Sequence, residues 1–346
     1  MSNSRSFAEM KNLFQAGLEG NKESLSLFGA TYLTQLKAYL IESNLQARDL
    51  PFAPNGVWEC LDAPHWYANR DGDAPGTLFL DTSRERVWLL YSLLKAEESD
   101  DAISKWISNI KGLDRCWLSY NHLMHYKKIE SWVEKGIGLN FADGLAPKAD
   151  AGKFSMKAWY SEKEPIPGIY DFLQRAKDQI AINSVRWQKK VGRTVDLSEE
   201  WYNNGKVTVN QAIDIDEVML SISDMANIYE DSLFEATINR DNKLCAFELN
   251  FSKTLDLEAF SDAVAVGKSG MNLWLTEIES ESDFKRFKGV DMHTWDIIFM
   301  DVGPDYAYLT IPGDGCVNAA PRIATVQGED NAGKTSIFFD GVEMFA

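Results

Sequence analysis

The order of hydrophobic periodicities between residues 206 and 279 constrains the fold more than any other feature of this sequence. KVTVN at 206–210 alternates like a strand, and a helix-spaced apolar stripe follows behind the cap pair Asp214 and Glu217. Two more alternating runs, a second amphipathic segment and a final alternating run follow at 233–239, 244–251, 257–267 and 271–279. This β-α-β-β-α-β order predicts a ferredoxin-like domain.

The residues before this region predict a mainly helical first half with a few short strands. A capping box of Ser6 and Glu9 begins an amphipathic helix at Phe7. Three- and four-residue apolar spacing predicts further helices at 22–45, 99–110, 113–135 and 169–180. Alternating or apolar runs predict strands at 78–80, 87–90, 154–160 and 182–188.

Together these patterns predict an α+β protein of two domains. Residues 1–194 are expected to form a mainly helical mixed domain with short strands. Residues 195–346 are expected to form an acidic ferredoxin-like domain with extra antiparallel strands and C-terminal hairpins. The extra strands are expected at 295–302, 306–311, 322–326 and 336–339.

Charge is distributed unevenly between the two halves. Residues 1–194 carry 25 basic and 24 acidic side chains, whereas residues 195–346 carry 10 basic and 28 acidic ones, a net charge of −18. An acidic half of this kind repels nucleic acid and anionic membranes and attracts basic proteins. The simplest alternative is that these charges only solvate the surface.

The segment GEDNAGKT, residues 328–335, matches the phosphate-loop pattern at every specified position. A phosphate loop needs a strand before the glycine-rich turn and a helix after it, because the first turn of that helix holds the phosphates. Here SIFF at 336–339 favours a strand, and only eleven residues follow Thr335. The segment is therefore interpreted as a β-hairpin loop, and no cofactor is predicted.

Two histidines are the best candidates for a metal site. His122 and His125 lie three positions apart on the predicted helix 113–135, so both imidazoles could face one ion, with Glu130 as a further ligand. Because no full ligand set is visible, structural or surface roles are favoured and no metal ligand is predicted.

Cysteine usage and hydropathy favour a cytoplasmic protein. Cys60, Cys116, Cys245 and Cys316 occur singly, which is typical of reduced thiols rather than of a disulfide framework or a zinc site. The N-terminal residues contain no apolar stretch of signal-peptide length. The longest apolar run, at 87–94, is far too short to span a bilayer, so no membrane association is predicted.

The charge distribution supports a non-enzymatic acidic binding protein as the favoured function. We expect an inhibitor, an immunity protein or a regulatory subunit that docks on a basic protein surface, such as that of a nuclease. The carboxylates expected to contact such a partner lie in one run: Glu277, Glu279, Glu281 and Asp283.

Two other functions remain open at this stage. One is a metal-assisted hydrolase that uses the His122 and His125 pair. The other is an RNA-binding ferredoxin-like module, because KLCAFELNF at 243–251 partly matches the pattern of an RNA-recognition strand. Nucleic acid is an improbable ligand for a domain of net charge −18, so this second alternative ranks last.

Overall fold

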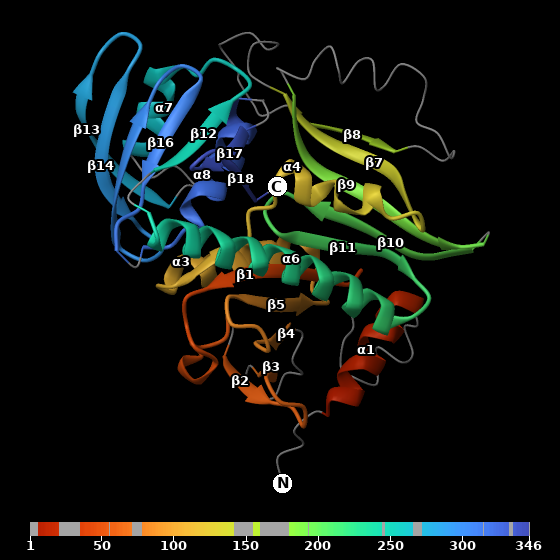
Figure 1. Ribbon diagram of the computed structural model, residues 1–346. Coiled ribbons are helices and arrows are strands. Elements are labelled where there is room, and N and C mark those ends of the chain that lie inside the picture. Colours follow the sequence, from red (N-terminus) through yellow and green to blue (C-terminus); the bar gives the residue numbers. More distant parts are fainter. Residues whose placement is uncertain are drawn as a thin grey trace.

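The protein is predominantly β and is built on two large antiparallel sheets (Figure 1). The computed structural model describes residues 6–20, 35–54, 56–70, 78–141, 155–159, 180–192, 194–243, 246–265, 272–313, 315–331 and 335–345. Within this part of the chain, 41% of the residues are in strands and 31% are in helices.

Eleven strands form the first sheet: β1 (Lys37–Ser43), β2 (Val57–Cys60), β3 (Trp66–Arg70), β4 (Leu78–Asp81), β5 (Val87–Ser92), β6 (Leu113–Arg115), β7 (Trp132–Phe141), β8 (Ser155–Trp159), β9 (Ile180–Val191), β10 (Thr194–Tyr202) and β11 (Lys206–Ala212). Their order is β2-β3-β4-β5-β1-β11-β10-β9-β7-β8, and β6 pairs with β1. β1 is buried at every position and pairs with β5 on one side and β11 on the other.

Seven strands form the second sheet: β12 (Phe247–Phe251), β13 (Leu273–Ser280), β14 (Lys285–Asp291), β15 (Asp296–Val302), β16 (Tyr306–Thr310), β17 (Thr335–Phe339) and β18 (Val342–Met344). Their order is β13-β14-β15-β16-β12-β17-β18, which makes β13 an edge strand. Buried and less buried positions alternate along β12, β15 and β16. This alternation gives the sheet an apolar inner face and a mixed outer face.

The helices lie against the faces of these sheets: α1 (Phe7–Glu19), α3 (Ala96–Asn109), α4 (Tyr120–Leu123), α6 (Ile215–Asp241), α7 (Leu257–Ala265) and α8 (Ala319–Asn331), with 3-10 turns η1 (Ala47–Asp49) and η2 (His125–Lys128). Side chains of α1 and α6 pack with one face of β1 and β5, and those of α3 pack with the other. The first sheet is therefore covered on both sides near its centre.

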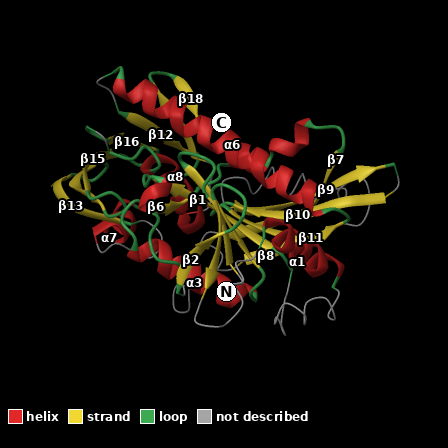
Figure 2. Cartoon of the chain, turned by 90° about the horizontal axis from the view of Figure 1, so that it is seen from below, coloured by secondary structure: helices red, strands yellow, loops and turns green. Residues whose placement is uncertain are grey.

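The helix α6 connects the two sheets. It contacts β5 and β11 of the first sheet and β17 and β18 of the second. Figures 1 and 2 both show it running across the molecule from one sheet to the other. Its buried stripe includes Val218, Met225, Leu233 and Ala236, so apolar burial continues along most of its 27 residues.

The predicted helical first half and ferredoxin-like second half are both wrong. The first half contributes most of an eleven-stranded sheet, and its helices are few and scattered. In the second half, residues 233–239 belong to α6 rather than to a strand, and β11 pairs in a different sheet from β12. Burial of Leu233 and Ala236 on the helical stripe outweighs the local alternation that predicted a strand.

Some individual elements are predicted correctly from their local sequence, and others are not. The helix α1 with its capping box and the helix α3 are confirmed, as are the strands at 78–80 and 87–90. The helix predicted at 113–135 is wrong, because β6, α4, η2 and the start of β7 occupy that range. Residues 37–43 of the helix predicted at 22–45 form β1, while 21–34 and 169–179 lie outside the described residues.

The division at residue 194 stays a prediction. At that point the chain passes from β9 into β10, and these two strands pair with each other in the first sheet. Among the described residues, no helix is sufficiently long and apolar to cross a membrane.

Gly205, in the turn between β10 and β11, allows three segments of the first sheet to approach closely. Its φ is +76°, and an added Cβ would lie 2.6 Å from the carbonyl oxygen of Cys116 and 3.0 Å from that of Leu40. We expect Gly205→Ala to lower the free energy of unfolding by about 1–3 kcal/mol for the backbone strain alone, with a further loss from the clash. Urea denaturation measures the change.

Gly192 provides the matched control for this substitution. It also has a positive φ, of +62°, but an added Cβ would meet nothing within 4 Å. Gly192→Ala should therefore show the strain without the clash. Equal losses in the two variants would contradict the close approach at Gly205.

Candidate functional site

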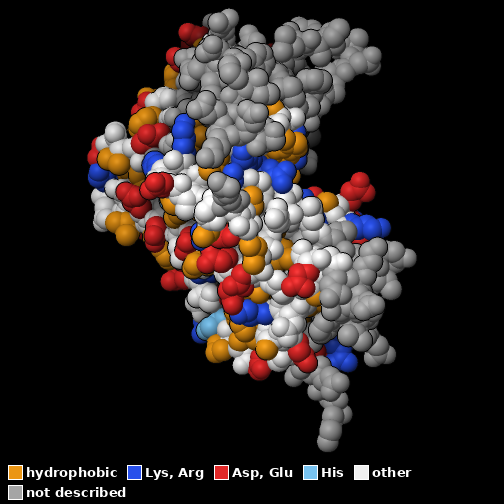
Figure 3. Space-filling model, turned by 90° about the vertical axis from the view of Figure 1, so that its right-hand side faces the viewer, with side chains coloured by type: hydrophobic (Ala, Val, Ile, Leu, Met, Phe, Trp, Pro, Cys, Tyr) orange, Lys and Arg blue, Asp and Glu red, His pale blue; other side chains and the backbone are white. Residues whose placement is uncertain are grey.

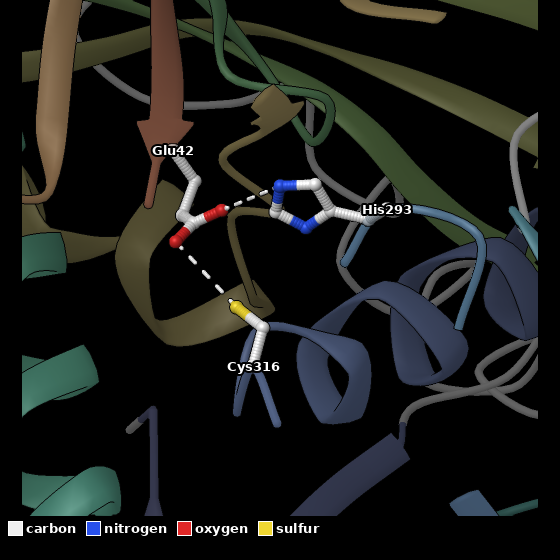
Figure 4. Close-up of side chains that lie close together, drawn as sticks. All are labelled: Glu42, His293 and Cys316. Atoms are coloured by element: carbon white, nitrogen blue, oxygen red, sulfur yellow. Dashed lines mark hydrogen bonds and ion pairs between the residues drawn. The ribbon is translucent and has the colours of Figure 1, made fainter. Parts of the chain in front are cut away.

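Three side chains from distant parts of the sequence meet where the two sheets join (Figure 4). Glu42 comes from β1, His293 from the turn between β14 and β15, and Cys316 from the segment before α8. The Nε2 atom of His293 lies 3.4 Å from Oε2 of Glu42, and the Sγ atom of Cys316 lies 3.5 Å from Oε1. All three side chains are buried. Glutamate, histidine and cysteine supply the atoms that bind divalent cations or carry acid–base and nucleophilic chemistry.

The turn that delivers His293 has a strained backbone. Asp291 accepts a hydrogen bond from the backbone N–H of His293 at 2.9 Å, and its carbonyl oxygen accepts one from Trp295. Trp295 has a φ of +66°, which is costly for a bulky side chain. The carbonyl oxygen of His293 accepts a hydrogen bond at 3.0 Å from the backbone N–H of Gly112, the residue before β6 of the first sheet. Contacts on both sides therefore hold the imidazole inward.

Arg86 connects the carboxylate and the thiol. Its guanidinium group pairs with Oε1 of Glu42 and lies 3.5 Å from Sγ of Cys316. Its backbone N–H donates to the carboxylate of Glu230 on α6 at 2.6 Å. Glu42 is thus fixed through one oxygen, while its other oxygen faces His293.

A second charged group lies beside these residues and is fully buried. Arg322 on α8 donates from Nε to Asp114 at 2.8 Å and from Nη1 and Nη2 to Asp291 at 2.9 and 3.1 Å. Asp114 also accepts from Asn318 at 2.8 Å. Arg322 and both carboxylates are no more than 1% exposed, so their charges depend on one another. These contacts join β6 of the first sheet to α8 and to β14 of the second.

The electrostatic surroundings of His293 favour its protonated form. Burial alone would lower the pKa of His293, but the neighbouring Glu42 carboxylate, followed by the contact with Cys316 and the charge of Asp114, raises it to about 10. Neither ring nitrogen makes a hydrogen bond of normal geometry to a described residue, and the same holds for Oε2 of Glu42. The site therefore holds buried polar atoms whose bonding capacity is not used.

The predicted histidine pair is not part of this cluster. His122 is buried in α4, where its Nδ1 lies 2.8 Å from Oγ of Ser119 at the helix cap. Burial lowers the pKa of His122 to about 4, with a smaller effect from His125. His125 lies on the following 3-10 turn. Among the described residues, the three-ligand grouping contains Glu42, His293 and Cys316 and neither of these two histidines.

The GEDNAGKT segment is not the β-hairpin loop that was predicted, because its residues 328–331 form the end of α8 and its last residue, Thr335, begins β17. α8 extends to Asn331, and β17 begins at Thr335. The expected strand at 322–326 is therefore wrong, while the strand after Thr335 is confirmed. This is the reverse of the order that a phosphate loop requires, because no helix begins after the lysine.

The four carboxylates predicted to contact a partner lie on the edge strand β13 and in the turn after it. The Glu277 carboxylate accepts from Nζ of Lys285 at 2.8 Å, and this bond is the main reason why the pKa of Glu277 is lowered. Glu279 pairs with Arg286 at 2.6 Å. The other two, in the turn, are exposed. Neighbouring cations thus offset part of the charge of this run.

The outer face of the second sheet exposes large apolar side chains on β13, β15 and β16, whereas Glu277 accepts a hydrogen bond from Ser261 of α7, which packs on the other face. Trp274 is 59% exposed, Ile297 49%, Tyr308 43% and Phe299 38%. Strand register brings them together, because Trp274 and Ile297 both pair with Val290 of β14. Lys288 lies over the ring of Phe299, with its Nζ 5.6 Å from the ring centroid. The outer face is therefore a mixed aromatic and charged surface.

Acidic side chains do not form one continuous area on the face turned to the viewer in Figure 3. They lie in separate groups among apolar and basic side chains. Part of the acidic excess of residues 195–346 is on α6, where Asp216 pairs with Lys11 and Glu217 with Lys189. These contacts offset some of the negative charge of the second half with cations from the first.

Sequence reasoning missed the buried cluster because its members are far apart in the chain. Glu42 and Cys316 are separated by 274 positions. One local signal was available: Glu42 lies in the apolar run KAYLIES, and a carboxylate inside a buried strand requires a charged partner. The interpretation of that run as part of a helix concealed the signal.

Comparison with known proteins gives two related matches. The family model described as MJECL33-like protein matches residues 1–327, which include both sheets' main strands and all three cluster residues. A relative from Methanocaldococcus jannaschii, with the name uncharacterized protein MJECL33, is 26% identical over 340 residues. The match covers 83% of this chain and 82% of the relative.

Proposed function

The chain belongs to the MJECL33-like family, and for this member we propose a non-enzymatic binding function in which the second sheet docks on a basic protein surface. The partner class is an enzyme or assembly with an exposed cationic site, for instance a nuclease, and the chain acts on it as an inhibitor, immunity protein or regulatory subunit. One observation carries this proposal: aromatic side chains remain exposed on the outer face beside an acidic edge strand.

The apolar part of the outer face has the composition of a binding surface. Trp274 stands on β13, and Phe299 and Tyr308 stand on the adjacent strands β15 and β16, with β14 between β13 and β15; each of the three side chains is at least 38% exposed. Tryptophan and tyrosine dominate binding energy at protein interfaces, because they bury a large area at a small entropic cost. A cluster of this kind supports a docking role more strongly than isolated surface residues do.

The charge around the outer face favours a cationic partner. Residues 273–302, which form β13 to β15, contain seven acidic and three basic side chains. The exposed Glu281 and Asp283 extend this charge beyond the sheet edge. Complementary charge of this kind increases association rates and selects the sign of the partner's charge.

The other two functions have weaker support. For a hydrolase built on His122 and His125, the described residues offer no converging ligand set, and His122 is engaged at a helix cap. An RNA-binding ferredoxin-like module loses its basis with the ferredoxin-like topology itself. The buried Glu42, His293 and Cys316 cluster is at most 4% exposed, so it does not favour direct contact with a substrate.

The docking proposal is tested with the double variant Trp274→Ala, Phe299→Ala used as immobilised bait beside the wild type. We expect the wild type to retain a basic protein in a salt-sensitive way, and the variant to bind that protein roughly thirtyfold to a thousandfold more weakly, at about 1–2 kcal/mol per aromatic anchor. Quantitative mass spectrometry identifies the retained protein, and titration with the purified partner measures the affinity.

Leu220→Ala is the matched control, because Leu220 is 55% exposed on α6, away from the outer face. It should bind the partner like the wild type. Retention of only neutral or acidic proteins, or equal binding by the double variant, would count against the proposal.

A further inference from the structure

We infer that Glu42, His293 and Cys316 form a binding site for one divalent transition-metal cation of the zinc class, at the junction of the two sheets. This inference concerns a site distinct from the proposed docking surface and does not depend on it. The carboxylate, imidazole and thiol are ligand types that zinc accepts together.

The separations between the ligand atoms fit a small tetrahedral ion. Nε2 of His293 and Oε2 of Glu42 are 3.4 Å apart, and Sγ of Cys316 and Oε1 of Glu42 are 3.5 Å apart. The three ligand atoms all lie within 4.8 Å of one another. Zinc bonds of about 2.0–2.3 Å place neighbouring tetrahedral ligands about 3.3–3.8 Å apart. In Figure 4 the three side chains come from three different segments, and His293 and Cys316 face the two oxygens of the Glu42 carboxylate.

The second observation is the unused bonding capacity of these atoms. Oε2 of Glu42 and both ring nitrogens of His293 are buried and make no hydrogen bond to any described residue. Both side chains are 0% exposed. Buried polar atoms almost always have partners, and an unpartnered group in a native structure often marks an unplaced ion or water. A cation bound by Nε2 of His293 and Oε2 of Glu42 satisfies these two atoms, while Nδ1 of His293 faces Asp114 on the other ring edge.

The surrounding residues are arranged to orient the ligands. Arg86 holds one oxygen of Glu42 and lies 3.5 Å from Sγ of Cys316. Asp114 lies 4.0 Å from Nδ1 of His293, on the ring edge opposite the ligand nitrogen. A carboxylate behind a ligand histidine is a common second layer of zinc sites, where it fixes the ring orientation.

The buried charges leave room for a divalent ion. Metal binding displaces the proton of His293, and with a neutral imidazole the carboxylates of Glu42, Asp114 and Asp291 face only the guanidinium groups of Arg86 and Arg322, which leaves one net negative charge. A Cys316 thiolate adds a second, and a divalent cation balances both. Three protein ligands leave the fourth tetrahedral position to a water molecule. Because Glu42 lies in the first sheet and His293 lies between two strands of the second, the bound ion links the two sheets.

The test is a Co²⁺ titration of the full chain after treatment with a chelator under reducing conditions. We expect one Co²⁺ per chain, with the visible bands of a tetrahedral ion and a near-ultraviolet band from thiolate-to-cobalt charge transfer. Zn²⁺ added afterwards should displace the Co²⁺ and abolish both sets of bands. The absence of stoichiometric Co²⁺, or of the thiolate band, in the wild type overturns the inference without any variant.

Two cysteine variants locate the ligand. Cys316→Ser should lose the thiolate band and bind Co²⁺ more than roughly tenfold more weakly. Cys116→Ser, which changes another buried thiol, should keep the band. Retention of the band in Cys316→Ser, or its loss in Cys116→Ser, would show that the thiolate ligand is not Cys316 and would overturn the proposed site.

Discussion

Replacing Arg322 by methionine is expected to lower the free energy of unfolding by about 3–5 kcal/mol, the largest loss among the substitutions considered. The methionine side chain fills much of the same volume, but it leaves the Asp114 and Asp291 carboxylates buried without their cation. Removing one member of a buried ion group is costly because the remaining charges stay desolvated. Since domains are stable by only about 5–15 kcal/mol, chemical denaturation detects such a loss easily.

Neutralising one of the two carboxylates that have lost Arg322 should recover part of the lost free energy of unfolding. In the double variant Arg322→Met, Asp291→Asn, one of the two uncompensated charges disappears. Arg286→Ala is the matched control, because Arg286 also bridges two carboxylates, Asp301 and Glu279, but does so at the surface. The control should stay close to the wild type. An Arg322→Met protein as stable as this control would show that the buried ion group of Arg322 does not stabilise the junction of the two sheets.

The second large effect is a gain in stability, expected above neutral pH, when Glu199 on β10 is replaced by glutamine. Burial raises the pKa of Glu199 to about 7, although Ser221 and Trp201 donate hydrogen bonds to the same carboxylate oxygen at 2.8 and 3.0 Å. Its Oε1 has no hydrogen-bond partner among the described residues. Above that pH the folded protein contains a buried carboxylate that lacks a bonded cation, and a neutral amide removes this cost.

The sign of the pH dependence follows from the direction of the shift. The folded pKa of about 7 lies above the ordinary value of 4.5, so the folded state keeps a proton that the unfolded state releases. The resulting stability is fully present below about pH 4.5 and is lost as the pH rises through 7. Glu199→Gln should therefore equal the wild type near pH 4.5 and exceed it by about 2–3 kcal/mol at pH 8.5.

Urea denaturation at both pH values measures this difference. Glu200→Gln is the control on the same strand, because Glu200 pairs with Lys157 at 2.8 Å and accepts from Ser184 at 2.9 Å. Glu200→Gln removes a carboxylate that already has its ion pair and hydrogen bond, so the free energy of unfolding of this variant should not rise above that of the wild type at high pH. A Glu199→Gln protein whose advantage does not grow between the two pH values would show that Glu199 titrates normally.

The elements that could be predicted from the sequence are those fixed by short-range signals. The capping box at Ser6 and Glu9 places α1 correctly, and the apolar run at 87–90 lies within β5. The errors occur where distant contacts decide. Tyr39 and Leu40 continue the helical spacing of the apolar residues before them, yet pairing with β5 and β11 makes KAYLIES the central strand β1. Burial on both faces removes the alternation that normally identifies a strand.

The candidate sites show the same limit. The carboxylates of β13 could be found from the sequence because they lie close together in the chain, but their pairing with Lys285 and Arg286 depends on the β13–β14 hairpin. Nothing in the sequence brings Glu42 to His293 or Cys316, since their contact requires both sheets to be in place. Charged residues inside apolar runs are the local pattern that points to such a junction.

The position of β1 between β5 and β11 has a consequence for the protein during its synthesis. β1 leaves the ribosome early and can pair with β5 and β6 soon afterwards, yet its residues 37–39 lack their partners on one edge until residues 206–208 have been translated. Until then the nascent chain carries an open, apolar strand edge, which is the kind of surface that chaperones bind. Completion of the first sheet is therefore a late event in the folding of this chain, set by the order of its strands.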